Sequence, residues 1–358
     1  MTEIDRVRKQ QSLTPISEMV PALLGRAKTL LNVPRMLATM APGWAYYLAT
    51  GKTPDRTYMA MRRLFYLTDG RFNDAVHEVV RRLRPPVALD RTTGVLGDMQ
   101  GAHLDRVLRA LDEDGFYVFD ERLADSAVEE IVDFSLRTPC TPRGENVVRE
   151  PVLFDASQQR SPVLDFSPTD LATCAPLCRL LADRSVLALA QAFLRSSVIL
   201  EAPAMWWSTP GSGEPSSVAA QLFHVDIDRL RFLNFSFLLT DVDAHNGPHC
   251  YVRTSQRNKP QALRRDGRYS DEEISSHYPD QIVEIGGARG TIFVTDNRAF
   301  HKGKNLQNGA RLLFQMVLAS SSFGQTYERV RVPADLNPDL RDAIGRFPFT
   351  YSRFIAAA

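Results

Sequence analysis

Residues 232–242 read FLNFSFLLTDV, and this stretch decides how the second half of the chain is interpreted. Its apolar residues alternate with Asn234 and Ser236, which is the period-two pattern of a β-strand. Similar runs, rich in β-branched and aromatic residues, surround it: SSVILEA from 196, AMWWS from 204, IVEI from 282, GTIFVTD from 290 and RLLFQMVLAS from 311. Many short strands without regular intervening helices predict an antiparallel sandwich or jelly roll.

The first hundred residues have a helical pattern instead. Apolar residues recur with the helical period over Ile16–Leu31 and again over Phe72–Leu83, where Pro85-Pro86 ends the helix. Val33–Thr50 is the most apolar early stretch. We interpret it as a helix packed within this region, with a helix lying on a membrane surface as the alternative.

The pattern changes near residue 100. A short amphipathic helix at Leu104–Leu111 and an acidic turn lead into the strand Phe116–Phe119. We therefore predict a helical region over residues 1–100 and a β-rich domain over 101–358. An insertion at about 256–282 interrupts the strands; in it Ser270 and Glu273 have the spacing of a capping box that opens a helix. Long insertions of this kind often act as lids or binding loops.

Composition excludes several classes of protein. A hydrophobic share of 44% with 24% charged residues is ordinary for a globular protein, and a net charge of +1 gives no field that would attract nucleic acid. The N-terminus lacks the apolar core of a signal peptide, and no apolar run is long enough to span a membrane. The 4 cysteines match no zinc motif, so we expect buried thiols and a reducing, cytoplasmic location.

One short motif predicts a metal site. In the extended segment His224-Val225-Asp226, the imidazole and the carboxylate point to the same side. His301, which follows the strand Thr291–Thr295 by a short turn, is the expected third ligand. Two histidines and one carboxylate form the facial site of non-heme Fe(II) oxygenases, which leaves positions open for a chelating 2-oxo acid and O₂.

Arg311 supports this interpretation. It lies in an otherwise apolar strand, and a buried guanidinium needs a partner. A carboxylate that binds it through two hydrogen bonds is the natural partner. The distal carboxylate of 2-oxoglutarate would supply that group, so Arg311 is predicted to select this co-substrate over shorter 2-oxo acids.

Between about Asp112 and Gln325, the sequence resembles the phytanoyl-CoA dioxygenase-like group of Fe(II)/2-oxoglutarate oxygenases. The shared features are, in order, Asp114-Gly115-Phe116, His224-Val225-Asp226, Asn246-Gly247-Pro248, Gly287 to Phe293, His301 and Arg311. The resemblance implies a double-stranded β-helix, a cupin-like jelly roll, with Fe(II), 2-oxoglutarate and O₂ as cofactors. It makes His224, Asp226 and His301 the catalytic metal ligands and Arg311 the co-substrate residue.

The resemblance also implies the reaction. Related halogenases replace the carboxylate ligand with a small residue, whereas Asp226 is present here. We therefore expect hydroxylation of an aliphatic carbon in a small or medium-sized metabolite, with decarboxylation of 2-oxoglutarate to succinate. Two positions depart from the family pattern: Arg253 to Gln256 replace a common Pro-Gly-Ser-His stretch, and Gly303 replaces a common hydroxyl residue.

Four further residues are candidates for the site. Asn234 and Ser236 share one strand face and are predicted to bind the co-substrate, with ordinary solvent-facing polar residues as the alternative. Trp206 and Trp207 face opposite ways, so at most one lines a substrate cavity, and we assign Trp207 to it together with His249. Basic residues at 257–268 favour either an anionic or carrier-linked substrate or a solvated charged surface.

Alternative interpretations remain open at this stage. Asp241, Asp243 and His245 form a rival set of ligands with His249, although His245-Asn246-Gly247 is typical of a turn. The departures from the family favour a catalytically silent binding or scaffold protein as the second hypothesis. A cupin-like metal isomerase or hydrolase is the third. The helical region could cover the barrel, mediate a homo-dimer or bind a substrate carrier.

Overall fold

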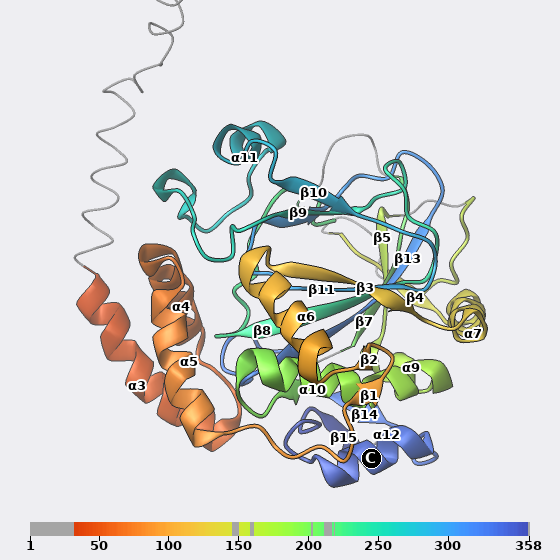
Figure 1. Ribbon diagram of the computed structural model, residues 1–358, viewed down its shortest axis with the longest axis horizontal. Coiled ribbons are helices and arrows are strands. Elements are labelled where there is room, and N and C mark those ends of the chain that lie inside the picture. The colour runs from red at the N-terminus through yellow and green to blue at the C-terminus, as the bar shows by residue number, and fades with distance from the viewer. Residues whose placement is uncertain are drawn as a thin grey trace, which may run out of the picture.

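A large antiparallel sheet forms the centre of the molecule (Figure 1). The computed structural model describes residues 32–144, 150–157, 161–201, 203–210, 217 and 219–356, so the helix predicted over Ile16–Leu31 lies outside the described residues. The strand order is β3-β11-β8-β13-β7-β5-β4, and β6 pairs with the end of β13. The bounds are β3 Phe116–Arg122, β4 Cys140–Pro142, β5 Val163–Phe166, β6 Ile199–Leu200, β7 Ala204–Ser208, β8 Phe232–Leu238, β11 Thr291–Thr295 and β13 Arg311–Ala319.

A smaller sheet packs against the first. It has the order β10-β9-β12, with β9 at His249–Val252, β10 at Ile282–Ile285 and β12 at His301–Gly303. Leu238 and Phe293 of the large sheet share one apolar cluster with Tyr251 and Ile285 of the small sheet, so this cluster holds the two sheets together. The chain therefore has the predicted jelly-roll core. Strands β4, β5, β9 and β12, each of three or four residues, were absent from the prediction.

Strand β8 shows how the alternating pattern is used. Phe235 and Phe237 point to the apolar cluster that contains the helices, whereas Leu238 points to the cluster between the sheets. Asn234 and Ser236 share the inner face with Leu238 and are 3% and 2% exposed. The alternative that they face solvent is therefore wrong.

Helices cover the outer face of the large sheet (Figure 1). They are α6 Gly101–Glu113, α7 Asp125–Arg137, α8 Pro168–Leu171, α9 Ala175–Leu181, α10 Arg184–Leu194 and α12 Pro338–Arg346. Two small pairs complete this side: the hairpin β1 Thr93–Gly94 and β2 Gly97–Asp98, and the parallel pair β14 Val330–Val332 and β15 Phe354–Ala356. All four cysteines are free and buried, as predicted.

The predicted insertion lies between β9 and β10. It contains the short 3-10 helix η1 at Gln261–Leu263 and the helix α11 at Asp271–His277. The Ser270 hydroxyl accepts a hydrogen bond from the Glu273 amide at 3.2 Å, so the predicted capping residue is confirmed. Tyr269 and Ile274 anchor the insertion in an apolar cluster with the residues around the metal-site segment.

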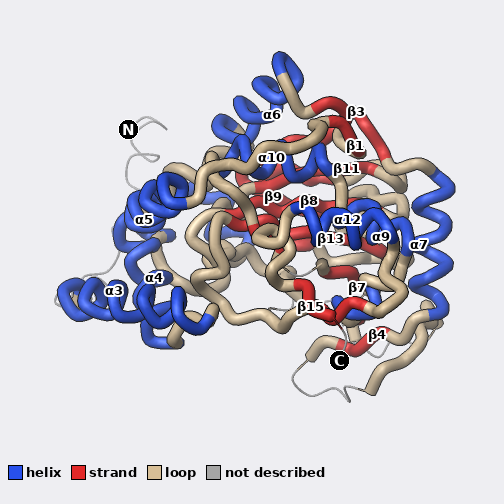
Figure 2. The backbone as a smooth tube through the Cα atoms, turned by 90° about the horizontal axis from the view of Figure 1, so that it is seen from below, coloured by secondary structure: helices blue, strands red, loops and turns tan. Residues whose placement is uncertain are grey.

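Three helices pack on one side of the sheets: α3 Val33–Thr50, α4 Asp55–Thr68 and α5 Arg71–Leu83 (Figure 2). Met61 and Phe65 of α4 share an apolar cluster with Phe223 and Val225 of the barrel. Helix α3 crosses α4 closely, since a side chain at Gly43 would collide with Thr57. Among the described residues, no helix is long and apolar enough to cross a membrane. Met36 of α3 shares an apolar cluster with Ala60 and Leu64 of α4, so α3 packs within the helical region, as expected.

Candidate metal centre

His224 and Asp226 lie on an extended segment before β8 that pairs with the chain around His301. The His224 amide donates to the His301 carbonyl and the His301 amide donates to the His224 carbonyl, both at 3.0 Å. The Asp226 amide donates to the Asn297 carbonyl, also at 3.0 Å. These backbone bonds place the three predicted ligands side by side, although they lie far apart in the sequence.

The side chains of this segment alternate as predicted. Phe223, Val225 and Ile227 belong to the apolar cluster shared with the helices α4 and α5. His224 and Asp226 face the other way and line a cavity inside the barrel. The apolar residues therefore fix the segment from behind and leave the polar groups free for chemistry.

The three side chains present their ligand atoms to one point. One atom from each of His224, Asp226 and His301 lies within 4.8 Å of the others. His224 Nε2 is 3.6 Å from Asp226 Oδ1, and His301 Nε2 is 3.3 Å from Asp226 Oδ2. A cation at this point would be bound by two imidazoles and a carboxylate, the set expected for Fe(II).

Backbone carbonyls orient both imidazole rings. His224 Nδ1 lies 3.0 Å from the Leu222 carbonyl oxygen, and His301 Nδ1 lies 3.0 Å from the Ala299 carbonyl oxygen. A carbonyl only accepts, so the proton resides on each Nδ1 and the lone pair of each Nε2 is available to a metal. Burial lowers the pKa of His224 to about 3, which keeps that ring neutral.

The carboxylate of Asp226 is held in its ionised form. Burial alone would raise its pKa, but the interactions with His301, His224 and Asn297 outweigh burial and lower the pKa below the ordinary value. Asn297 Nδ2 donates to Asp226 Oδ2 at 3.0 Å. Asn297 is itself fixed, because Thr295 Oγ1 donates to its Oδ1 at 2.7 Å. This chain of hydrogen bonds sets the direction of the carboxylate.

Arg311 lines the same cavity and is 6% exposed. Its NH1 donates to the Gly247 carbonyl, its NH2 donates to Ser208 Oγ at 3.1 Å, and its buried Nε has no partner. Burial lowers its pKa to about 10, and no carboxylate of a described residue offsets that effect. Arg311 is thus a buried cation that lacks an anion.

The cavity that joins these groups has a volume of about 250 Å³. Besides the ligands and Arg311, it is lined by polar and apolar side chains from both sheets: Arg143, Ala204, Trp206, Ala219, Ala220, Ser236, His249, Asn297, Gly303, Leu313 and Gln315. It is therefore open to a molecule that contacts the metal position and Arg311 together.

Comparisons with known proteins agree with this site. The family model described as phytanoyl-CoA dioxygenase (PhyH) matches residues 111–311, which is more than half of the chain. The chain belongs to the phytanoyl-CoA dioxygenase family. A search of curated proteins found no match.

Three solved structures illustrate what this phytanoyl-CoA dioxygenase family member is similar to. The 2-oxoglutarate-dependent epimerase SnoN from nogalamycin biosynthesis is 16% identical with a TM-score of 0.47, over 61% of this chain and 83% of that chain. EctD from S. alaskensis is 19% identical with a TM-score of 0.44, over 66% and 80%. HygX from Streptomyces hygroscopicus, with nickel and 2-oxoglutarate bound, is 17% identical with a TM-score of 0.44, over 66% and 93%.

The cofactors of this family, Fe(II) and 2-oxoglutarate, fit the site on two observations. His224, Asp226 and His301 are the one group of three or more potential metal ligands within reach of each other among the described residues. Arg311 is buried without a carboxylate, and its Nε has no partner. The first observation matches a metal and the second matches the distal carboxylate of a diacid.

Two of the four further candidate residues line the cavity. Ser236 does so, and its hydroxyl accepts from Gln315 Nε2 at 3.5 Å. His249 does so as well; its ring stacks on His301 with centroids 5.5 Å apart, and its buried Nε2 has no partner. Asn234 is buried with an unpartnered Oδ1, but it is not among the cavity-lining residues.

The prediction for Trp207 is wrong. Trp207 is 5% exposed and stacks on Phe154 in the outer apolar cluster, with centroids 4.0 Å apart. Its neighbour Trp206 lines the cavity instead. The pairing of β7 with β13 decides this, since Trp206 lies opposite Leu313 on the inner face.

Asp243 of the rival set and a further acidic residue, Asp228, have structural roles. Asp243 Oδ1 accepts from the amides of His245 and Asn246 at 2.7 and 3.1 Å, which is the predicted turn. Asp228 lies outside the ligand group and accepts from the hydroxyls of Tyr58 and Tyr327 at 3.2 and 2.6 Å. Burial raises the pKa of Asp228, and the neighbouring charge of Asp226 adds to this effect.

The sequence analysis missed three residues that line the cavity, Arg143, Asn297 and Gln315. It also missed Ser208, which contacts Arg311. Ser208 ends the predicted strand AMWWS, but its importance follows from lying opposite Arg311 in the sheet register. One feature of the sequence could have identified Asn297: it lies four residues before His301, on the turn that follows β11.

Proposed function

We propose that this protein is an Fe(II)- and 2-oxoglutarate-dependent dioxygenase that hydroxylates an aliphatic carbon of a small or medium-sized metabolite. One observation carries the proposal. Two imidazoles and one carboxylate share a cavity with a buried arginine that has no carboxylate partner. A metal site alone would not require Arg311, and an anion site alone would not require the histidines.

The three ligands would hold the metal through His224 Nε2, His301 Nε2 and Asp226. The carbonyls of Leu222 and Ala299 keep the rings in the required tautomer. The chemistry that Fe(II), 2-oxoglutarate and O₂ supply when bound is oxidative decarboxylation of 2-oxoglutarate to succinate, coupled to hydroxylation of the substrate. The chain itself provides orientation and excludes water.

Arg311 would bind the distal carboxylate of 2-oxoglutarate. Its contacts with Gly247 and Ser208 fix the plane of the guanidinium before the co-substrate arrives. A fixed guanidinium loses less entropy on binding than a flexible one. Ser236 and the unpartnered Nε2 of His249 are the further groups proposed to bind the co-substrate or the substrate.

The substrate would enter on the side of Trp206 and Leu313. Arg143 lies there with its guanidinium carbon 5.8 Å from the Trp206 ring centroid, and its Nε donates to Asp165 Oδ2 at 2.7 Å. We propose residues 101–358 as the oxygenase domain. Residues 1–100 are proposed as a helical region that supports it, because Tyr58 reaches Asp228 beside the ligand segment.

The experiment that tests the proposal measures succinate. Purified protein with Fe(II), ascorbate and 2-oxoglutarate should form succinate above a metal-free control, and His224→Ala should reduce this by at least a hundredfold, since it removes a ligand from the metal. His277→Ala is a matched control, because His277 is exposed on α11. Equal turnover by His224→Ala and the parent would reject the proposal.

A further measurement separates the two alternatives. A silent scaffold predicts no saturable binding of 2-oxoglutarate in the presence of Mn(II), whereas an oxygenase predicts tight binding. A cupin-like isomerase or hydrolase predicts turnover that is independent of 2-oxoglutarate and insensitive to Arg311→Ala. The Nε2 atoms of His224 and His301 both point toward Asp226, which favours the oxygenase. A scaffold protein would not need two Nε2 lone pairs directed at one metal position.

A further inference from the structure

A second cavity, distinct from the metal centre, lies between the helical region and the end of the barrel. Its volume is about 320 Å³. It is lined by residues of α3, of α5 and its end, and of the segments that follow β13 and α12: Trp44, Tyr47, Leu48, Gly51, Val80, Leu83, Arg84, Ser320, Ser321 and Phe349. The cavity at His224 has none of these residues in its lining, so the two spaces are separate.

One wall of this cavity is a fixed aromatic surface. The Trp44 ring lies 4.8 Å from the Phe323 ring and 5.4 Å from the Tyr47 ring, centroid to centroid. The Tyr47 hydroxyl accepts a hydrogen bond from the Ser322 amide at 3.1 Å, so Tyr47 cannot swing away without losing it. The wall is therefore preformed and apolar, which suits a hydrocarbon chain or ring.

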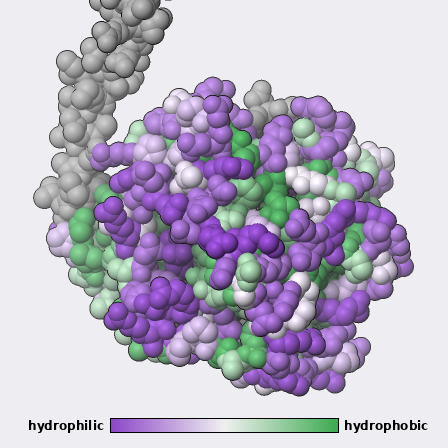
Figure 3. Space-filling view, in the orientation of Figure 1, coloured by the Kyte–Doolittle hydropathy of each residue, from purple (hydrophilic) through white to green (hydrophobic). Residues whose placement is uncertain are grey.

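The entrance adds more apolar surface. Leu48 is 64% exposed and Leu83 is 70% exposed, and both line the cavity. In the space-filling view, apolar side chains gather at the left of the molecule, over α3 (Figure 3). Exposed large apolar side chains that flank a hollow are typical of a binding site, because a ligand would remove them from water.

The opposite wall is polar and positively charged. The guanidinium carbon of Arg84 lies 4.3 Å from the Phe349 ring centroid, and the Arg84 side chain forms no ion pair or hydrogen bond with any described residue. The nearby Glu201 does not neutralise it, since Arg229 Nε lies 2.8 Å from Glu201 Oε1. Arg84 thus presents unused donors at the rim of an apolar space.

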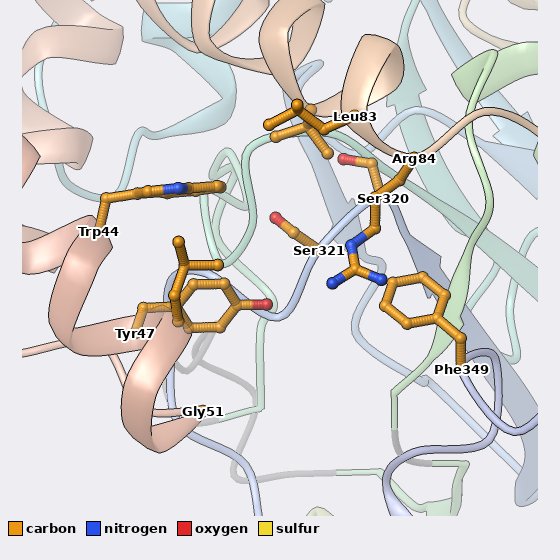
Figure 4. Close-up of a pocket in the computed structure, with 10 residues that line it drawn as sticks. Trp44, Tyr47, Gly51, Leu83, Arg84, Ser320, Ser321 and Phe349 are labelled. Carbon is orange, nitrogen blue, oxygen red and sulfur yellow. The ribbon is translucent and has the colours of Figure 1, made fainter.

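Ser321 is the second polar group of this wall, and it is 5% exposed. Its hydroxyl is buried without a hydrogen-bond partner. Figure 4 shows that hydroxyl directed into the space between Trp44 and Arg84. A buried hydroxyl without a partner costs free energy, and a ligand oxygen at this point would recover it. Ser320 cannot take this role as easily, because its hydroxyl contacts His77 Nδ1 at 3.0 Å.

We propose that this cavity is a binding site for an amphiphilic monocarboxylate. The carboxylate would contact Arg84 and the Ser321 hydroxyl, and the apolar body would lie along Trp44 and Tyr47. At roughly 30 Å³ for each water-sized group, the cavity holds on the order of ten non-hydrogen atoms, the size of a medium-chain fatty acid. A bound molecule would connect α3, α5 and the barrel, so it would also stabilise the helical region.

Octanoate is the probe for this site, with 1-octanol as its uncharged counterpart. The full chain is first saturated with Mn(II) and 2-oxoglutarate, so that a carboxylate cannot bind at Arg311. Calorimetry should then show saturable octanoate binding. Arg84→Met should raise the Kd for octanoate about tenfold and the Kd for 1-octanol less than twofold, because only the carboxylate uses the charge. Ser321→Ala should raise both values by roughly threefold.

Two variants serve as controls. Arg82→Met removes an arginine from the exposed surface of α5, where it pairs with Glu78. Arg311→Met removes the positively charged guanidinium from the metal-centre cavity. Both should leave the octanoate Kd unchanged, and at one octanoate concentration the rise in Tm should be smaller for Arg84→Met than for the parent protein.

Four results would overturn the proposal. The first is an absence of saturable octanoate binding, and the second is an Arg84→Met variant that binds octanoate like the parent. The third is loss of binding in Arg311→Met, which would assign octanoate to the metal-centre cavity. Capture of anionic phospholipid vesicles without binding of monomeric octanoate would likewise overturn it, since a lipid surface would then be the partner.

Discussion

Replacing Arg311 with methionine would test the co-substrate site most directly. The substitution removes a buried guanidinium while keeping an unbranched side chain of similar length. Arg311 is 6% exposed, and its donors already contact Gly247 and Ser208. Removing one partner of a buried, hydrogen-bonded charge pair costs roughly 2–5 kcal/mol. We take about 3 kcal/mol, which raises the Kd for 2-oxoglutarate roughly a hundredfold.

Calorimetry on Mn(II)-loaded protein measures this Kd, with 2-oxobutyrate as the comparison ligand. Because 2-oxobutyrate lacks the distal carboxylate, its Kd should change less than threefold in Arg311→Met, and this also shows that the metal site is still folded. Arg331→Met is the matched control, since Arg331 is exposed on β14. An Arg311→Met variant that keeps the parent's preference for 2-oxoglutarate would refute the role given to Arg311.

Two further predictions concern metal binding and stability. Asn297→Ala should weaken Mn(II) affinity about tenfold, because Asp226 loses the hydrogen bond that orients it; unchanged affinity in a metal titration would contradict this. Burial lowers the pKa of His77 from 6.5 to about 4. Between pH 6.5 and pH 4 the unfolded chain binds a proton at His77 and the folded chain does not. The free energy of unfolding is therefore highest above pH 6.5 and falls by at most about 3 kcal/mol as the pH decreases toward 4. Urea unfolding should show that His77→Gln removes this part of the pH dependence, and a parallel curve for both proteins would disprove it.

Local patterns were sufficient to predict much of the barrel and the group of three potential metal ligands. The spacing of His224 and Asp226 placed both on one side of an extended segment, and this holds although the segment forms only isolated bridges and no long strand. Arg311 was predictable because a charge inside an apolar strand requires an explanation. Helix α5 was predictable from its period and from the prolines that end it.

Cross-strand register set the limit of the prediction. Trp206 and Trp207 alternate in the sequence, but both faces of the large sheet are buried, so hydrophobicity could not show which face was the inner one. Ser208 matters because β7 pairs with β13, which lies about a hundred residues away in the chain. Such pairings depend on tertiary packing, to which a single sequence gives no direct access.

The contact between the helices and the back of the ligand segment has a practical consequence for anyone shortening this chain. A fragment that starts at residue 101 would lack Met61 and Phe65, and the side chains of Phe223 and Val225 would then be exposed to water. It would also delete the Tyr58 hydroxyl that donates to Asp228. Weak iron binding by such a fragment would therefore reflect a damaged support behind the ligands, and the intact polypeptide is the form to purify.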